Sequence, residues 1–413
     1  MEPAGTSVPG AAVAPGGPGT DTGGRTARRP ELEIATRLSG GVLGAGMLIM
    51  PPVVAALTGG HSLRVWSAHI LLGGSVSLLL AMLVRGRVRP TSLAGTVGAL
   101  LGSWAERAVN GAFAIAFTAG QAAIAWFAAS CLLTAADGSL PRPGTDGLLL
   151  ALGLLAAAVF AALGPLSLPA VVLRLRPWVT GALALACAAW GWPAVPAVGS
   201  HTPLAPPGLS AGGAQWLALA ALFFAGVGWE AVTAVAPVAT AGRRRTAAGV
   251  ALGAASVAVV YLGLATVQRL AAGAPAAQDA VSAPLRWVFA VATAVVLTSY
   301  CFTNVRTAAR IAARLRPAER GPSEQSPSER GPAKAVIASV GASCCFFACA
   351  GAAWDGAVPL LLLGPAAAAL IGYGLAAVAA VRCGGPLLRW AGAAVLLVLV
   401  GVVVLAVPLL LGG

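Results

Sequence analysis

Charged residues are scarce in this chain, and acidic residues are the scarcest. Only 9% of its 413 residues are charged, and 13 acidic residues stand against 26 basic ones. A soluble domain carries about 25% charged residues. Hydrophobic residues make up 58% of the chain, and the mean hydropathy is +0.86. This composition excludes an ordinary soluble domain and indicates a protein embedded in a membrane.

Common metal and catalytic motifs are also missing. The seven cysteines form no C-x-x-C pair, and His61, His69 and His201, which we place in or near outside loops, form no H-E-x-x-H motif. The stretch C-C-F-F-A-C at 344–349 could hold a metal. No histidine or acid lies near it in sequence, which favours small apolar residues on a packed helix. No nucleophile–base pair is visible, so we expect neither an enzyme nor a cofactor, and a membrane-embedded enzyme is the disfavoured alternative.

The apolar residues form runs of about 20, the length of a transmembrane helix. We predict eleven spans, an odd number that places the two ends of the chain on opposite sides of the membrane. Residues 1–30 have no apolar run and are predicted to form a disordered cytoplasmic tail. The predicted spans are 34–57, 65–84, 106–133, 147–164, 177–197, 214–239, 247–267, 284–308, 334–353, 357–381 and 386–411.

The net charge of +13 could indicate a nucleic-acid partner, so the positions of the arginines matter. They gather at alternate junctions between the apolar runs, whereas the intervening loops carry aspartates. This alternation follows the positive-inside rule and differs from the continuous basic face of a nucleic-acid-binding protein. We therefore expect no nucleic-acid partner and a multi-pass protein of the cell membrane with a cytoplasmic N-terminus. Examples are Arg85, Arg87 and Arg89, then Arg243, Arg244 and Arg245, against Asp137, Asp146 and Asp279.

Two predicted spans are interrupted at corresponding places. The first reads RLSGGVLGAGMLIMPPVVAAL and the sixth reads LALAALFFAGVGWEAVTAVAPVA. Non-helical backbone is tolerated inside a membrane only where it lines a cavity or is buried in protein. Interrupted segments at matching positions in two halves of a chain are a pointer to a transporter's binding site. The alternative is that these glycines, among 53 in the chain, only allow close helix packing.

The broken spans are five apart, and this odd offset gives the two halves opposite orientations in the membrane. The prediction is therefore an all-α polytopic membrane protein with a 5+5 inverted repeat. Residues 31–413 would form a single transmembrane domain. Within it, repeat one covers about 34–197, repeat two about 214–381, and an extra helix 386–411.

The broken helices also suggest a ligand. The N-terminus of a half-helix offers free N–H groups and a positive dipole end to a carboxylate, and unwound carbonyls suit an ammonium group. An α-amino acid carries both groups a few ångströms apart. The surrounding side chains are apolar, which predicts a neutral and rather hydrophobic substrate. They are Val42, Leu43, Met47, Phe223, Phe224 and Trp229.

Glu230 is the only acid placed within a span, and burying an ionisable group there is costly enough to suggest a function. Three roles are open. Its carboxylate could cap free N–H groups of the unwound segment, it could take up and release a proton during transport, or it could pair with a cationic group of the substrate. No basic residue is placed in the interior of a span, so a buried Arg or Lys partner is not expected.

The stretches L-G-A-G-M-L-I-M-P-P at 43–52 and F-F-A-G-V-G-W-E at 223–230 resemble the amino acid–polyamine–organocation (APC) permeases. They are most similar to the group that exports methionine and branched-chain amino acids, and the resemblance extends from about residue 34 to 381. It implies a LeuT-type fold with broken helices 1 and 6. It also implies secondary transport of neutral amino acids, with export as the expected direction and import or exchange as alternatives.

The resemblance also implies roles for individual residues. Gly44, Ala45 and Gly46 match the segment that holds the substrate carboxylate, and Phe224 matches a gating aromatic residue. Gly228 and Glu230 match the G-x-E element of helix 6. The predicted substrate-binding residues are Val42, Leu43, Gly44, Ala45, Gly46, Met47, Gln121, Phe224, Gly226, Gly228 and Tyr300, with Glu230 as a coupling or helix-cap residue.

Two of these positions have plain structural alternatives. Gln121 matches a polar substrate contact on helix 3, but it could only bridge two helices. Tyr300 matches an aromatic residue that closes an inner gate, but it could be an ordinary core residue.

The chain departs from the family in three respects. Many relatives have twelve spans where we predict eleven. Relatives driven by sodium use hydroxyl groups on helix 8, where Thr298, Ser299 and Thr303 are candidates without a convincing pair. Some proton-coupled relatives carry a lysine in helix 5, whereas the only lysine here, Lys334, lies in a loop. Coupling to H⁺ or Na⁺ therefore stays open, and a permease-derived sensor is disfavoured because no sizeable soluble domain is attached.

Overall fold

The computed structural model describes residues 29–85, 92–137, 144–190, 210–235, 241–272, 282–315, 333–353 and 357–411. Within these ranges every regular element is a helix, and no strand is present. The predicted N-terminal tail lies outside the described residues up to position 28.

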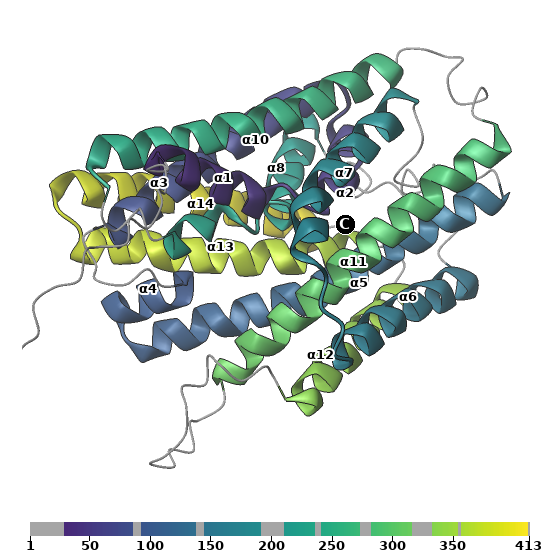
Figure 1. The fold of residues 1–413 in the computed structure, drawn as a ribbon. Coiled ribbons are helices and arrows are strands. Elements are labelled where there is room, and N and C mark those ends of the chain that lie inside the picture. Colours follow the sequence, from purple (N-terminus) through teal and green to yellow (C-terminus); the bar gives the residue numbers. More distant parts are fainter. Residues whose placement is uncertain are drawn as a thin grey trace, which may run out of the picture.

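The described helices pack side by side in a bundle (Figure 1). Three short 3₁₀ helices, η1 to η3, interrupt the α-helical order. In chain order the elements are α1 (Pro30–Val42), α2 (Gly46–Thr58), η1 (Gly59–His61), α3 (Ser62–Val84), α4 (Leu93–Leu101), α5 (Ser103–Asp137), α6 (Thr145–Leu163), α7 (Ala170–Ala189), α8 (Ala211–Ala221), η2 (Leu222–Phe224), η3 (Trp229–Ala234), α10 (Arg243–Ala272), α11 (Ala283–Leu315), α12 (Lys334–Ala353), α13 (Ala357–Cys383) and α14 (Pro386–Leu411).

Ten helical stretches among the described residues are long and apolar enough to cross a membrane, where the sequence predicts eleven spans. The difference arises at the first predicted span. It is divided between α1 and α2, each of only 13 residues, and α2 continues through η1 into α3 as one stretch, Gly46–Val84. The other predicted spans each correspond to one helical stretch, although α7 begins at Ala170 rather than at 177.

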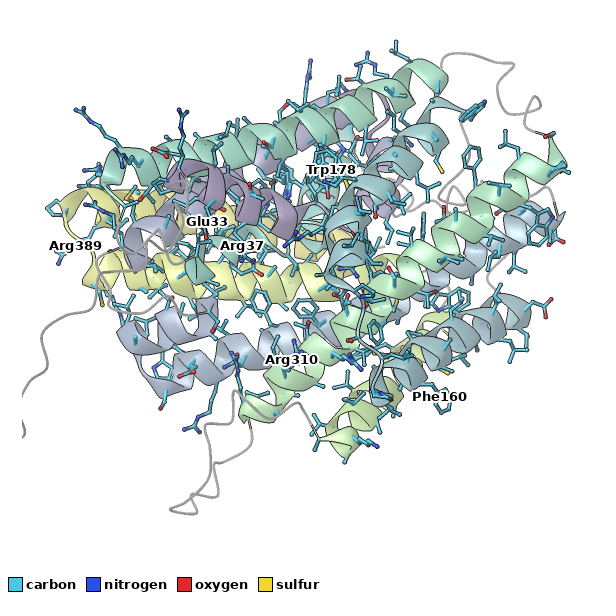
Figure 2. The ribbon with its side chains drawn as sticks, viewed as in Figure 1. Glu33, Arg37, Phe160, Trp178, Arg310 and Arg389 are labelled. Carbon is cyan, nitrogen blue, oxygen red and sulfur yellow. The ribbon has the colours of Figure 1, made fainter. Side chains whose placement is uncertain are left out.

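Helix α5 forms the centre of the bundle. Within its most apolar window 78% of the residues are buried, against 17% for α7 and 22% for α14. Helices α11 and α13 both pack along α5, while α1, α3 and α10 pack together on another side (Figure 1). The exposed faces of α6 and α7 carry large apolar side chains such as Phe160 and Trp178, as a lipid-facing surface requires (Figure 2).

Arg306 of α11 caps the C-terminal end of α6. Its Nη2 donates to the carbonyl oxygen of Gly164 at 2.7 Å, its Nε donates to that of Ala162 at 3.2 Å, and its guanidinium lies over the ring of Phe302. The last carbonyls of a helix lack intrahelical partners and carry its negative dipole end, so a cation there is favourable.

Replacing Arg306 with alanine is expected to destabilise the protein by about 1–3 kcal/mol, because those carbonyls lose their donors. The measurement is the midpoint of thermal unfolding in detergent. The matched control is Arg310→Ala, one turn further along α11, where the side chain is exposed (Figure 2). Equal midpoints for the two variants would contradict this role of Arg306.

Candidate functional site

The first span is broken over residues 43–45. At the end of α1 the Leu43 N–H donates to Ser39 O. At the start of α2 the Met47 N–H donates to Gly44 O at 3.0 Å. Leu43 itself is extended, with φ −79° and ψ 101°. Among the described residues, none accepts a hydrogen bond from the N–H groups of Gly44, Ala45 or Gly46. The break therefore exposes free donors at the positive end of α2.

The sixth span is broken over residues 225–228. Helix α8 tightens into η2, and the chain then turns before η3. Gly228 has φ +138°, a conformation that side-chain-bearing residues rarely adopt. The predicted second half-helix is, in its described part, the 3₁₀ helix η3 and not an α-helix. A 3₁₀ stretch in the middle of a helix often marks a functional hinge or a sequence under strain.

The two breaks lie against each other through glycine contacts. A Cβ atom on Gly41 would lie 2.9 Å from the Gly228 carbonyl oxygen, and one on Gly46 would lie 2.7 Å from the Ala225 Cβ. Real Cβ atoms do not approach this closely, so both positions require glycine. The sequence predicted Gly46 and Gly228 as site residues and missed Gly41, which looks locally like any packing glycine.

Glu230 holds the unwound segment of helix 6 together with Tyr373 of α13. Its Oε2 accepts a hydrogen bond from the Gly228 N–H at 2.9 Å, and it lies 2.5 Å from the Tyr373 hydroxyl. The same hydroxyl lies 2.8 Å from the Gly226 carbonyl oxygen. The capping interpretation of Glu230 expects the first of these contacts. Tyr373 was not predicted, and no local pattern marks it.

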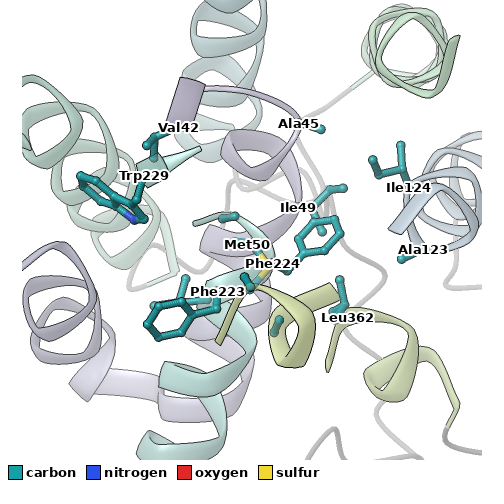
Figure 3. Close-up of a cluster of buried hydrophobic side chains, with 14 of the residues drawn as sticks. Val42, Ala45, Ile49, Met50, Ala123, Ile124, Phe223, Phe224, Trp229 and Leu362 are labelled. Atoms are coloured by element: carbon teal, nitrogen blue, oxygen red, sulfur yellow. The ribbon is translucent and has the colours of Figure 1, made fainter. Parts of the chain in front are cut away.

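Trp229 and Phe223 lie on the side of the broken sixth span that faces away from α5 (Figure 3). The Trp229 indole packs on Gly73 of α3, and its Nε1 donates to His69 Nε2 at 3.5 Å. Phe223 packs edge-on against His69 and beside Tyr373. His69 is therefore not near an outside loop but 1% exposed inside α3, because its ring fills the space next to Gly226.

Phe224 lies on the other side of the broken sixth span, toward α5. Figure 3 shows it on the side of Ile49, facing Ala123 and Ile124 of α5, while Phe223 and Trp229 point away from them. Its ring also lies next to Gly120 of α5, where an added Cβ would be 3.4 Å away. Phe223 and Phe224 are adjacent in sequence but pack against different helices, Phe223 against α3 and α13 and Phe224 against α5. The sequence alone does not show this.

Three further predicted positions lie around α2. The Val42 carbonyl oxygen accepts from the Tyr261 hydroxyl at 3.4 Å, and Leu43 is half-buried. Met47 lines a small cavity between α2, α7 and α10, together with Cys187 and Leu264. Met47 therefore faces away from α5.

Tyr300 of α11 adjoins the helix 1 break. A Cβ atom on Gly44 would lie 3.5 Å from its ring, and its hydroxyl lies 3.3 Å from that of Thr180. The Arg176 guanidinium lies over the ring, 3.9 Å from its centre. A basic residue therefore does lie within a membrane-length helix, α7, contrary to the prediction. The helix starts seven residues before the predicted span and so takes in Arg176.

Arg176 also contacts one of the hydroxyl groups that were candidates for a sodium site, that of Thr303, and the backbone carbonyl of Ser299. Its Nη1 donates to the Ser299 carbonyl oxygen at 3.1 Å and to Thr303 Oγ1 at 3.0 Å. A guanidinium is always charged, so its position beside Thr303 disfavours a second cation there.

Gln121 bridges helices. Its Oε1 accepts from Asn304 Nδ2 of α11 at 3.3 Å, and its Nε2 donates to the Phe117 carbonyl oxygen at 2.7 Å. The side chain is 2% exposed. Its polar groups are thus committed to protein partners, which favours the bridging alternative over a substrate contact.

The fold is that of the LeuT-type transporters, with two broken helices in a helical bundle. No family model matches the chain, and no curated protein sequence matches it. Among solved structures, the chain is similar to MhsT, a LeuT-fold protein crystallised in complex with L-phenylalanine. The two share 14% sequence identity with a TM-score of 0.56, over 92% of this chain and 99% of MhsT. At this identity the likeness shows the fold alone.

Proposed function

We propose that this chain is a secondary transporter of neutral, hydrophobic amino acids. It works by alternating access around spans 1, 3, 6 and 8, which correspond to α1–α2, α5, α8–η3 and α11. The observation that carries the proposal is the set of free N–H groups of Gly44, Ala45 and Gly46 at the start of α2. A substrate carboxylate would satisfy these donors and benefit from the helix dipole.

The surroundings of the break support an apolar substrate side chain. Ala45, Ile49, Ile124 and Phe224 are all buried and lie on the α5 side of the break (Figure 3). No charged side chain contacts the break from that side within the described residues. A solved neighbour of the same fold, MhsT, binds L-phenylalanine, an amino acid of this class.

Purified protein in proteoliposomes should take up radiolabelled L-phenylalanine, L-leucine or L-methionine in exchange for the same amino acid inside. L-Lysine and L-glutamate are the matched negative controls, because on the α5 side of the break no charged side chain among the described residues could pair with a second charge. Failure of all three apolar amino acids to exchange or bind would overturn the proposal.

We further propose export across the cell membrane, with a cytoplasmic N-terminus, as in the methionine and branched-chain exporter group of the APC superfamily. The support is the sequence resemblance at 43–52 and 223–230 and the arginine distribution. Cells that lack their own exporter should gain resistance to toxic methionine or leucine analogues when they express this chain. Unchanged tolerance with intact exchange in proteoliposomes would favour an importer or exchanger instead.

Transport should not require sodium, because Arg176 already donates to Ser299 O and Thr303 Oγ1. Exchange of L-leucine is expected to proceed at the same rate when potassium replaces sodium on both sides of the vesicle. A severalfold loss of exchange in potassium would show that a sodium site exists despite the guanidinium.

A further inference from the structure

We infer that the small cavity between α2, α7 and α10 is the binding site of one water molecule. This water joins carbonyl oxygens of α2 that lack donors to the side chain of Gln268 on α10. The inference goes beyond the proposed function and does not depend on it. It follows from the hydrogen-bonding groups of the residues that line the cavity and from the size of the cavity.

Two prolines remove hydrogen-bond donors from the middle of α2. In a regular α-helix the N–H groups of residues 51 and 52 would donate to the carbonyl oxygens of Met47 and Leu48. Pro51 and Pro52 have no N–H group, and among the described residues no backbone N–H from outside the helix replaces them. Met47 and Leu48 are buried, so bulk water does not serve these carbonyls. In membrane helices, neighbouring helices and ordered waters satisfy the groups that a proline frees.

Gln268 of α10 adds a third acceptor beside the same cavity. It lines the cavity together with Met47, Leu48 and both prolines. Its Oε1 is buried and accepts no hydrogen bond from any described residue. A buried oxygen without a donor is unfavourable, as are the two carbonyl oxygens. The residues around one small space thus carry three acceptors that lack a donor.

The size and lining of the cavity select water as its occupant. Its volume is about 20 Å³, and about 10–15 Å³ is enough to hold one water molecule. Water brings two O–H donors, and the thiol of Cys187 in the lining is a weak further partner. None of the described lining residues is charged, so a metal ion would be buried there without a counter-charge, which is costly.

The other contacts of α10 with the first span are of the same kind. The Tyr261 hydroxyl donates to the Val42 carbonyl oxygen at the end of α1, at 3.4 Å. Arg269 Nη1 donates to the Gly60 carbonyl oxygen just after α2, at 3.3 Å. Gln268 lies about two turns after Tyr261 and opposite the prolines. The water therefore completes a series in which α10 serves carbonyls before, within and after α2.

Radiolytic footprinting of the detergent-purified full chain tests the inference. X-ray pulses produce hydroxyl radicals from water, including water bound inside a protein, and mass spectrometry locates the oxidised residues. Met47 and Cys187 carry oxidisable sulfur atoms and line the cavity. Met50 and Cys344 are equally buried but lie outside the lining, so they are the matched internal controls. Met47 and Cys187 are expected to be oxidised severalfold faster than Met50 and Cys344.

Two variants should abolish the fast oxidation. Gln268→Leu keeps a similar volume but loses the oxygen, and Ala184→Val fills the cavity while Gln268 stays in place. In both, oxidation of Met47 should fall to the rate of Met50. The control is Thr266→Val, also on α10, whose exposed hydroxyl bonds only within its own helix. It should leave the oxidation of Met47 unchanged.

A second measurement links the water to the prolines. Pro51→Ala returns an N–H group to the Met47 carbonyl, so the water has one acceptor fewer to serve. Gln268→Leu is therefore expected to lower the midpoint of thermal unfolding by a few degrees in the wild type, and by clearly less in the Pro51→Ala background. Equal losses in the two backgrounds would contradict the link between Gln268 and this carbonyl.

The wild type alone can overturn the inference, whichever variants fold. Equal oxidation rates of Met47 and Met50 would show that the cavity holds no water. Fast oxidation of Met47 that persists in Gln268→Leu would overturn the assignment of Gln268 as a partner of the water. Neither result bears on L-leucine exchange, which tests the proposed function separately.

Discussion

Replacing Gly228 with alanine is expected to reduce amino-acid exchange in proteoliposomes to background. Gly228 has φ +138°, and holding a non-glycine residue in such a conformation costs about 1–3 kcal/mol. The added Cβ would also overlap the carbonyl oxygen of Gly41, so the two breaks could not keep their contact. The Glu230 carboxylate, which caps the Gly228 N–H, would be displaced with them.

The control for this variant is Gly263→Ala in α10, where an added Cβ meets nothing within 4 Å. Alanine has a higher helix propensity than glycine by about 1 kcal/mol, so this variant should keep full exchange and equal or higher stability. Full exchange by Gly228→Ala, with wild-type stability, would show that the close approach of the two breaks is dispensable.

Gly73→Ala is expected to produce the second largest loss, both of stability and of exchange. An added Cβ would overlap the Trp229 indole, which is fully buried against α3. Overpacking of this kind typically costs about 1–3 kcal/mol. Trp229 begins η3, and its carbonyl oxygen accepts from the Ser77 hydroxyl at 2.7 Å, so displacement of the indole should reach the Glu230 segment. The thermal midpoint in detergent and L-leucine exchange measure the two effects.

The adjacent glycine provides the control. A Cβ on Gly74 would lie 3.4 Å from the Ala254 Cβ, a tight contact but not an overlap, so Gly74→Ala should be much milder. Combining Gly73→Ala with Trp229→Phe, which shortens the ring system, should recover part of the lost stability. Equal losses for the two glycine variants would show that the indole is not the critical neighbour.

Much of the fold could be predicted from the sequence, because its signals are local. Apolar length marks the spans, and glycine marks the two places where the helix ladder opens, at 43–45 and 225–228. The offset between these breaks predicted an inverted repeat, and the resemblance to the APC permeases implied the LeuT-type fold. The boundaries of the repeats within the domain stay a prediction.

The partners within the site could not be predicted, because they come from distant parts of the chain. Tyr373 is 143 residues from Glu230, and Arg176 is 127 residues from Thr303. Locally each is an ordinary residue of its helix, and its role appears only when another helix lies beside it. His69 was misplaced for the same reason, since its burial depends on helix 6 packing across it.

The sequence by itself determined that this protein lies in a membrane and where its first and sixth spans break. Chain length, apolar composition and the missing Cβ atoms of glycine act on the nearest few residues, wherever those residues end up in space. Only the tertiary structure decided how the opened backbone is satisfied. The free groups at Gly226 and Gly228 are served by Tyr373 and Glu230, while those at Gly44, Ala45 and Gly46 have no acceptor among the described residues. Hydrogen bonds act over about 3 Å, and that proximity is set by helix packing, not by position in the sequence.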